Sequence, residues 1–236
     1  MFRGQGRAVA TSAANALVLR APDGALVHAL ELPREGGPWV VHFHDNTQTA
    51  EEALGFGRAL HARGLGVVLM EYRGYGAAQG LDPSEHALVA DAEVLLAALA
   101  ARGIGPDRVL LSGRSLGTGV AAELARRGRG AALLLVAPFT SVVDLVREAA
   151  PWSPASLLVR DPFDTASKAA QIAVPTLVIH GDADEIVPFH MGEALASAIP
   201  HATLLRVAGA THADVLDRDA PRVLASIAAL ATTSCR

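Results

Sequence analysis

The sequence has little that would support a cross-linked, membrane-spanning or nucleic-acid-binding protein. Its one cysteine, Cys235, lies in a last turn that we expect to fray, so a disulfide or a cysteine zinc site cannot form within the chain. The longest convincing apolar run, Ala131–Phe139, is much shorter than the roughly 18 residues that a membrane span needs. The net charge is −4 and no basic block occurs, which argues against a nucleic-acid partner.

The beginning of the chain does not lead us to expect a secretory signal. The stretch MFRGQGRAVATSAANA has no continuous apolar run ahead of its small residues, as a secretory signal would require. We therefore expect a soluble, cytoplasmic protein. A chain of 236 residues can bury one large core, and no repeat or linker divides it, so we expect a single domain over residues 1–236.

Short apolar runs typical of strands alternate with helical patterns through most of the chain. Asn15–Arg20 and Ala25–Leu32 flank a Pro-Asp-Gly turn and predict a hairpin. The strands expected after it are Trp39–His44, Gly66–Tyr72, Asp107–Ser112, Ala131–Ala137, Pro175–His180 and Thr203–Val207. The expected helices are Thr49–Arg63, Pro83–Arg102, Ser115–Arg127, Phe189–Ile199 and Asp219–Ala231. This alternation predicts an α/β fold with a mostly parallel sheet, whose ligand sites lie beyond the carboxyl ends of the strands.

One serine follows an expected strand inside the sequence VLLSGRSLGTG. Ser115 lies between Gly113 and Gly117, and a sharp strand-to-helix turn would make side chains at both glycines collide. The pattern fits an exposed nucleophile, and it also fits a serine cap of a glycine-rich helix. The stretch GTGVAA matches a dinucleotide-binding pattern too, but the next strand ends Val-Ala-Pro without the acid that binds a ribose.

A serine nucleophile needs a base, and the base needs an orienting acid. HGDADEIVP follows the next-to-last expected strand and offers Asp182, Asp184 and Glu185 as the acid. GATHADV follows the last strand and offers His212 as the base. Because the carboxyl ends of parallel strands share one edge of a sheet, we expect both segments to lie beside Ser115.

These motifs resemble those of the α/β-hydrolases. GRSLGTGVA resembles their nucleophile elbow, and HGDADEIVP and GATHADV resemble their acid and histidine loops. The stretches EYRGYGAAQG, VAPFTSVVDLV and RDPFDTASKAAQIAVPTLVIHG are similar to the Bem46-like serine hydrolases, which include protein depalmitoylases and bacterial esterases. The resemblance runs from about Gly36 onward. It implies an α/β-hydrolase fold with helices on both faces of the sheet and a minimal lid over residues 138–173.

The resemblance also implies a role for each candidate residue. Ser115 is the expected nucleophile and His212 the general base, while the family pattern G-x-x-D-x-x-V-P selects Asp184 as the acid. The backbone N–H groups of Leu116 and, by position, Asn46 are the expected donors of the oxyanion hole. Neither a metal ion nor an organic cofactor is expected.

The oxyanion loop departs from the family pattern at Asp45, which stands where the family has glycine. A carboxylate at this place would oppose a developing oxyanion unless it faces solvent or pairs, with Arg73 or Arg114 as candidate partners. On this ground Asp45→Gly is expected to leave activity equal or higher. The departure also keeps open an alternative function, a binding protein of the same fold with weak or lost catalysis.

The expected function is that of a serine hydrolase that cleaves carboxylic ester or thioester bonds through an acyl-enzyme. The segment from Phe139 to Ala173 is short and contains several prolines, which predicts an accessible site. Such a site suits a small acyl ester or thioester, or a lipidated peptide lying across the surface. Amide or carbon–carbon bond hydrolysis remains an alternative for the bond that is cleaved.

Overall fold

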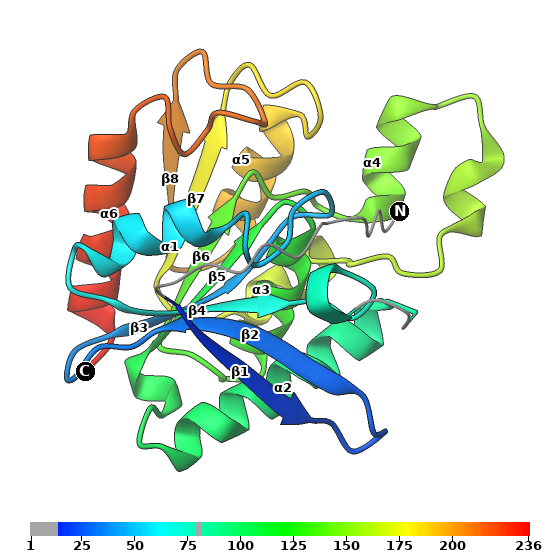
Figure 1. The fold of residues 1–236 in the computed structure, drawn as a ribbon. Helices are drawn as coiled ribbons and strands as arrows, with labels where there is room; N and C mark the ends of the chain where they lie inside the picture. Colours follow the sequence, from blue (N-terminus) through cyan, green and yellow to red (C-terminus); the bar gives the residue numbers. More distant parts are fainter. Residues whose placement is uncertain (1–13, 79–81) are drawn as a thin grey trace.

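A computed structural model describes residues 14–78 and 82–236 (Figure 1). Most of the stretch in which a secretory signal was sought lies outside the described residues, as do Gln79 and Gly80 at the end of the EYRGYGAAQG motif.

Eight strands form one twisted sheet in the order β1-β2-β4-β3-β5-β6-β7-β8. Strands β3 to β8 are parallel to one another, and β2 is antiparallel to both of its neighbours, β1 and β4. The strands are β1 Asn15–Arg20, β2 Leu26–Leu32, β3 Trp39–Phe43, β4 Gly66–Glu71, β5 Val109–Arg114, β6 Ala132–Val136, β7 Thr176–Gly181 and β8 Ala202–Val207. The expected hairpin and mostly parallel sheet are therefore confirmed.

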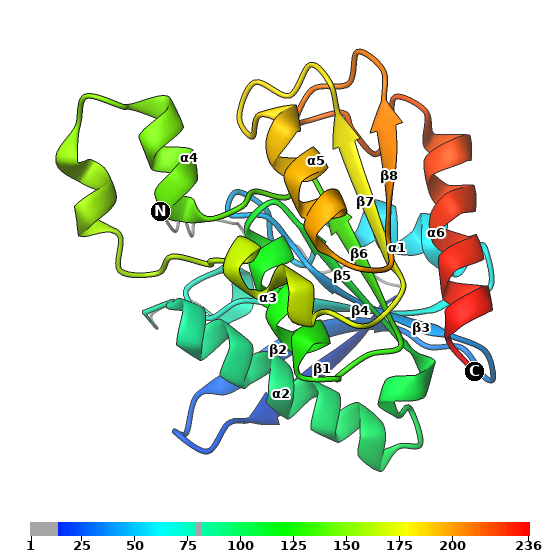
Figure 2. The ribbon, with the colours of Figure 1, turned by 180° about the vertical axis from the view of Figure 1, so that it is seen from behind.

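Helices cover both faces of this sheet, as the alternation of segments predicts (Figures 1 and 2). One apolar core lies between the sheet and helices α2, α3 and α5, and a second core lies between the sheet and helices α1 and α6. The α-helices are α1 Leu54–His61, α2 Glu85–Ala101, α3 Leu116–Arg126, α4 Val142–Ala149, α5 Phe189–Ala198 and α6 Ala220–Ser234. The short 3-10 helices are η1 Gly76–Ala78, η2 Pro106–Arg108, η3 Pro154–Leu158 and η4 Ala166–Gln171. Within the described ranges, no helix combines the length and apolar character needed to cross a membrane.

The order in which successive strands are added to the sheet changes direction at β3. Strand β4 lies on one side of β3, and β5, the next strand in the chain, lies on the other side. Phe43 at the end of β3 is paired with Gly113 of β5, so the loops that leave these two strands begin next to each other. Ligand sites of open α/β sheets form at such a switch point, beyond the carboxyl ends of the strands.

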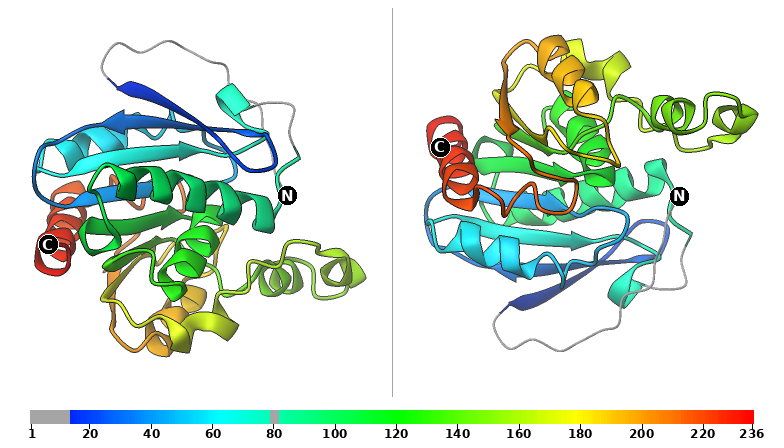
Figure 3. Two further views of the ribbon diagram at one scale, coloured as in Figure 1. Left: turned by 90° about the horizontal axis from the view of Figure 1, so that it is seen from below. Right: turned by 90° about the horizontal axis from the view of Figure 1, so that it is seen from above.

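The segment between β6 and β7 extends away from the rest of the molecule (Figure 3). Helix α4 was not expected here; it begins where Ser141 Oγ accepts a hydrogen bond from Asp144 N–H, a capping interaction. Beyond α4, the side chains of Trp152, Leu157 and Leu158 are at least 80% exposed. The segment is therefore an outward-pointing arm rather than a cover packed over the sheet.

Two expected elements differ in where they begin. The helix expected from Thr49 begins at Leu54, because Thr49 and Glu52 cap each other and Leu54 N–H bonds the carbonyl only three residues back. The strand expected from Asp107 begins after η2 and continues through Arg114. This strand therefore delivers the chain directly to Ser115.

The expectation that the last turn frays is wrong. Cys235 is only 5% exposed and belongs to the core beneath α6. The N–H of Cys235 donates a hydrogen bond to Ala231 O. The N–H of Arg236 donates a hydrogen bond to Asp107 O, in η2 just before β5 begins. The C-terminal turn is thus fixed by packing and by hydrogen bonds.

Candidate active site

Ser115 occupies the bend between β5 and α3 in an unusual backbone conformation. Its φ of 47° and ψ of −113° lie in a region that costs a non-glycine residue about 1–3 kcal/mol. The bend is held by Ser115 N–H, which bonds Val136 O at 2.9 Å, and by the Thr118 hydroxyl, which bonds Ser115 O at 2.6 Å. Such strain at a serine on the ligand-binding edge of a sheet is typical of a functional site.

The two glycines around Ser115 allow the chain to pass unusually close to itself. A Cβ atom at Gly113 would lie 2.2 Å from Gly117 O, and a Cβ atom at Gly117 would lie 2.1 Å from Phe43 O. Both distances are far inside van der Waals contact, and the obstructing atoms are backbone. The expected collision of side chains at these positions is therefore confirmed.

His212 and Asp184 meet at the same edge of the sheet, one from the loop after β8 and one from the loop after β7. His212 Nδ1 lies 2.8 Å from Asp184 Oδ2. The carboxylate accepts, so Nδ1 carries the proton and a neutral ring presents Nε2 as its basic nitrogen. The other carboxylate oxygen accepts the N–H groups of Ile186 and Val187, which fixes Asp184 from the opposite side.

The side chain of Asp184 is fully buried, yet its surroundings favour the charged form. Burial alone would raise the pKa of this carboxyl, but hydrogen bonds from His180, His212 and the Val187 N–H outweigh burial and hold the pKa well below its usual value. His180 Nε2 lies 3.4 Å from Asp184 Oδ2 and 3.0 Å from Val187 O. His180 was not among the residues expected at the site, although its place near the end of β7, immediately before Gly181, was a usable signal.

The neighbouring acids have other partners. Asp182 binds Arg206 of β8 and accepts the N–H of Gly209, so it joins two loops. Asp214 accepts the N–H and hydroxyl of Thr211, a contact that closes the turn around His212. Glu185 is exposed. Asp184 is thus the acid that the fold brings to His212.

The two expected backbone donors lie in the loops that begin at the switch point. Leu116 is the first residue of α3, so its N–H belongs to the group at a helix start that has no carbonyl partner within the helix. Asn46 lies three residues beyond the end of β3 and is half-buried, with its carbonyl accepting a hydrogen bond from the Tyr75 hydroxyl.

The carboxylate of Asp45 is buried and fully engaged. Asp45 Oδ1 accepts the N–H and hydroxyl of Thr47, each at 2.7 Å, and the N–H of Gln48 at 3.0 Å. Asp45 Oδ2 lies 3.5 Å from Arg114 Nε, an ion pair that is not aligned as a hydrogen bond. Burial would raise the pKa of Asp45, but the hydrogen bonds from Thr47 and the charge of Arg114 lower it overall. Arg114 is therefore the partner of Asp45.

Arg73, the other candidate partner, lies in a separate ion-pair cluster. Its guanidinium binds Asp91 of α2 on one side and Asp23 of the β1–β2 turn on the other. These contacts join the β1–β2 hairpin to α2. The ion pair of Asp45 is therefore with Arg114 and not with Arg73.

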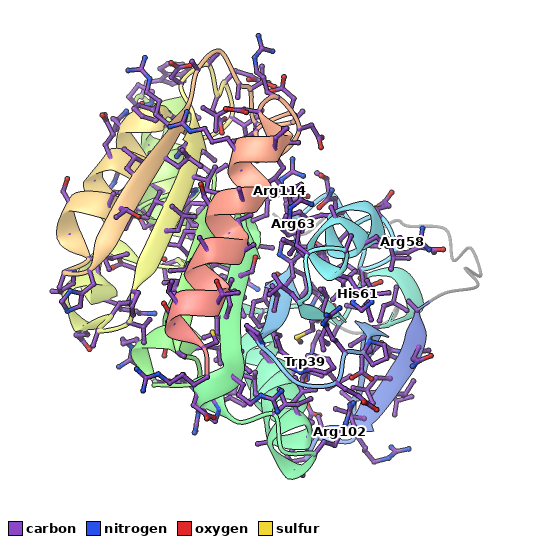
Figure 4. All side chains as sticks on the ribbon, turned by 90° about the vertical axis from the view of Figure 1, so that its left-hand side faces the viewer. Trp39, Arg58, His61, Arg63, Arg102 and Arg114 are labelled. Carbon is purple, nitrogen blue, oxygen red and sulfur yellow. The ribbon has the colours of Figure 1, made fainter. Side chains whose placement is uncertain are left out.

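Arg114 also contacts the histidine loop, a connection that the sequence did not indicate. Its Nη2 donates to His212 O at 2.9 Å and to Ala213 O at 3.2 Å. Figure 4 shows Arg114 between helix α6 and the α1 segment, at the edge of the sheet where these loops emerge. The residue directly before Ser115 thus links the loop after β3 to the loop after β8.

Among the residues that the structure describes, no group of three or more His, Cys, Asp or Glu side chains could hold a metal ion. The chemistry that the site offers is that of a hydroxyl, an imidazole and a carboxylate beside backbone N–H groups.

Comparison with protein families identifies the family of this chain. The family model described as serine aminopeptidase, S33, matches residues 38–163, which is more than half of the chain. The chain belongs to the α/β-hydrolase superfamily. A second model, described as alpha/beta hydrolase fold, matches residues 156–219. The two matches together include the loops that follow β3, β5, β7 and β8.

Several curated α/β-hydrolase relatives resemble the chain. It is 30% identical over 220 residues to alpha/beta hydrolase domain-containing protein WAV2 of Arabidopsis thaliana, covering 83% of this chain and 71% of that protein. It is 39% identical over 147 residues to human alpha/beta hydrolase domain-containing protein 17B, covering 61% of this chain and 49% of that protein. An uncharacterized Mycobacterium tuberculosis protein is 39% identical over 155 residues, covering 65% of this chain and 53% of that protein. The chain thus spans about half the length of the human and mycobacterial relatives.

Solved structures confirm the α/β-hydrolase fold. The esterase Pf2001 of Pyrococcus furiosus superposes with a TM-score of 0.80 at 14% identity, covering 100% of this chain and 98% of that one. Est1E of Butyrivibrio proteoclasticus, solved with ferulic acid, gives a TM-score of 0.76 at 17% identity, covering 93% and 99%. The expected fold class is therefore confirmed.

Proposed function

We propose that this protein is a serine hydrolase that cleaves carboxylic ester bonds, thioesters included, through an acyl-enzyme. The observation that carries the proposal is the 2.8 Å hydrogen bond from His212 Nδ1 to the buried carboxylate of Asp184, at the same sheet edge as the strained bend of Ser115. Serine hydrolysis needs a serine hydroxyl, an imidazole base and a carboxylate that orients the imidazole.

In the proposed reaction, the Ser115 hydroxyl attacks the ester carbonyl while His212 Nε2 takes its proton. The N–H groups of Leu116 and Asn46 stabilise the negative charge that develops on the carbonyl oxygen, each contributing about 3–4 kcal/mol. His212 then gives the proton to the departing alcohol or thiol. Water, deprotonated by His212, releases the acid from Ser115, while Asp184 holds the ring and stabilises its charged form.

Relatives and fold neighbours support an ester as the substrate. Pf2001 is named as an esterase, and a zebrafish relative that is 32% identical over 182 residues is named lysophosphatidylserine lipase ABHD12. The arm between β6 and β7 points outward and leaves little to enclose a substrate. We therefore propose a small acyl ester or thioester, or a lipidated peptide lying across the surface, as the substrate.

The alternative of a binding protein with weak or lost catalysis depended on an unpaired carboxylate at Asp45. Since Thr47, Gln48 and Arg114 engage that carboxylate, the reason for preferring this alternative is gone. We propose an enzyme rather than a binding protein.

The test compares wild type with Ser115→Ala. We expect a fluorophosphonate probe to label wild type at Ser115 and leave the variant unlabelled. Turnover of p-nitrophenyl acetate should fall by roughly 10⁴-fold in the variant, with folding intact. Equal turnover in the two proteins would remove Ser115 from the mechanism, and an unlabelled wild type would favour the binding protein.

The same assay tests the accessible site. Rates should fall smoothly as the acyl group of p-nitrophenyl esters is lengthened from acetate. A sharp preference for long acyl chains would contradict a minimal cap, and a matched thioester series would show whether the leaving group matters.

A further inference from the structure

We propose that Asp45 and Arg114 act together as positioning residues, setting the loop of Asn46 and the loop of His212 in place around Ser115. The inference deepens the proposed hydrolase function and rests on it. It assigns a purpose to the carboxylate of Asp45, the point at which the oxyanion loop departs from the family pattern that the sequence resembles.

Asp45 fixes the backbone on either side of Asn46. Its Oδ1 receives three hydrogen bonds from the two residues that follow Asn46, namely Thr47 N–H, Thr47 hydroxyl and Gln48 N–H. A side-chain oxygen that accepts backbone N–H groups two and three residues ahead closes a turn locally. The peptide N–H of Asn46 lies within that turn, so its direction depends on these bonds.

Arg114 fixes the backbone of the histidine loop. One nitrogen, Nη2, donates to the carbonyls of His212 and Ala213 at 2.9 and 3.2 Å. The ring of His212 is held at its other end by Asp184. The imidazole is therefore located by its backbone as well as by its acid.

The ion pair joins these two fixed loops. Asp45 Oδ2 and Arg114 Nε are 3.5 Å apart, and their side chains are only 6% and 12% exposed. An exposed pair at this distance would be screened by water, whereas a buried pair is costly to break because the remaining charge is left without a partner. Arg114 also precedes Ser115 directly, so the pair connects all three parts of the site.

These contacts reverse the expectation drawn from the sequence for Asp45→Gly. Glycine removes both the turn-closing oxygen and the charge that faces Arg114. We expect kcat to fall rather than stay equal or rise. A displacement of about 1 Å in a reacting group lowers rates by up to about a hundredfold.

Two substitutions at position 45 separate these roles. In Asp45→Asn, the amide oxygen must face the three donors of Thr47 and Gln48, so the turn is kept while the charge toward Arg114 is lost. We expect kcat to fall about tenfold with KM changed less than twofold. Asp45→Gly also loses the oxygen that closes the turn, so its kcat should fall further. Rates are normalised to the fraction of molecules that the fluorophosphonate probe labels.

Variants of Arg114 test the other half of the pair. Arg114→Gln should lose about tenfold in kcat, and Arg114→Lys, which keeps the charge, should recover part of that loss. The double variant Asp45→Asn with Arg114→Gln should lose clearly less than the product of the two single losses, because each single change already breaks the link. Losses that simply multiply would overturn the inference.

A matched control is Glu31→Gln. Glu31 is likewise buried and lies 2.6 Å from an arginine, Arg102, but at the opposite edge of the sheet. This control should lower thermal stability without changing kcat. If the Asp45 and Arg114 variants behave in the same way, losing stability alone, they are not positioning residues. If wild type is labelled and active and Asp45→Asn has the same kcat, this inference alone is overturned. If wild type is not labelled, the hydrolase proposal itself is overturned.

Discussion

At the scale of single residues, the site depends on how closely two strand ends approach each other. The carbonyl of Phe43 at the end of β3 occupies the space that a side chain at Gly117 would need. That approach brings the loop of Asn46 to the start of α3, where Leu116 N–H is unsatisfied by the helix. A glycine at position 117 is therefore a requirement of packing as well as of turn geometry.

Gly117→Ala tests this close approach. The added Cβ atom would lie 2.1 Å from Phe43 O, and backbone must move to admit it. We expect a loss of several kcal/mol in the free energy of unfolding, measured in urea, together with loss of probe labelling. Gly55→Ala is the control: Gly55 has open space and lies within α1, so alanine should leave stability unchanged or raise it by up to about 1 kcal/mol. Equal stability of Gly117→Ala and wild type would contradict the geometry.

At the scale of elements, apolar runs in the sequence were enough to predict the central strands, because these parallel strands are buried on both faces. The largely exposed strand β1 was predicted instead from the turn that joins it to β2. Helix α4 could not be predicted in the same way, since it projects outward and buries only Val142. The contact of His212 with Asp184 was predictable from the sequence, because both residues lie in loops that follow neighbouring parallel strands. Contacts such as Arg114 with the carbonyl of His212 join residues 98 positions apart, and no local pattern signals them.

A charged cluster holds α3 to the short helix η4 and gives the fold a dependence on pH. The Glu123 carboxylate is 7% exposed and contacts Arg126 and Arg127 of its own helical segment and Lys168 of η4. The hydrogen bond from Arg126 is the largest cause that lowers the pKa of Glu123 to about 2, against about 4.3 in an unfolded chain. The carboxylate therefore stabilises the fold fully above about pH 4.3, and this contribution is lost as the pH falls toward 2.

Glu123→Gln should accordingly melt several degrees below wild type at pH 7, since each kcal/mol lost is worth about 2–4 °C in a chain of this size. The gap in melting temperature should narrow between pH 4 and pH 2, where wild type loses the same contribution. Glu148→Gln is the control, because Glu148 is 42% exposed and its ion pair is with the exposed His190. Glu148→Gln should change the free energy of unfolding by less than about 1 kcal/mol at any pH. A Glu123→Gln gap that is as large at pH 2.5 as at pH 7 would contradict the assignment.

At the scale of the whole molecule, the candidate site is assembled from loops that follow β3, β5, β7 and β8, and the strand order sets the separation of the points at which these loops begin. Both helical layers support that sheet. Helix α6, the last element in the chain, packs on β6 and β7 and shares one core with α1. The C-terminal turn is part of this support, because Arg236 N–H bonds Asp107 O just before β5 begins.

The single thiol of the chain reports directly on this packing. Cys235 is 5% exposed, and burial, with a smaller effect of Asp107, raises the pKa of its thiol to about 11. Only about one molecule in a thousand would carry the reactive thiolate at pH 8. Native protein should therefore react with a disulfide reagent such as DTNB at least a hundredfold more slowly than protein unfolded in guanidinium, which should release one equivalent at once. Asp107→Asn should speed the native reaction only slightly, because burial is the larger cause. Rapid release from native protein would mean that the C-terminal turn opens in solution and that α6 does not anchor the sheet there.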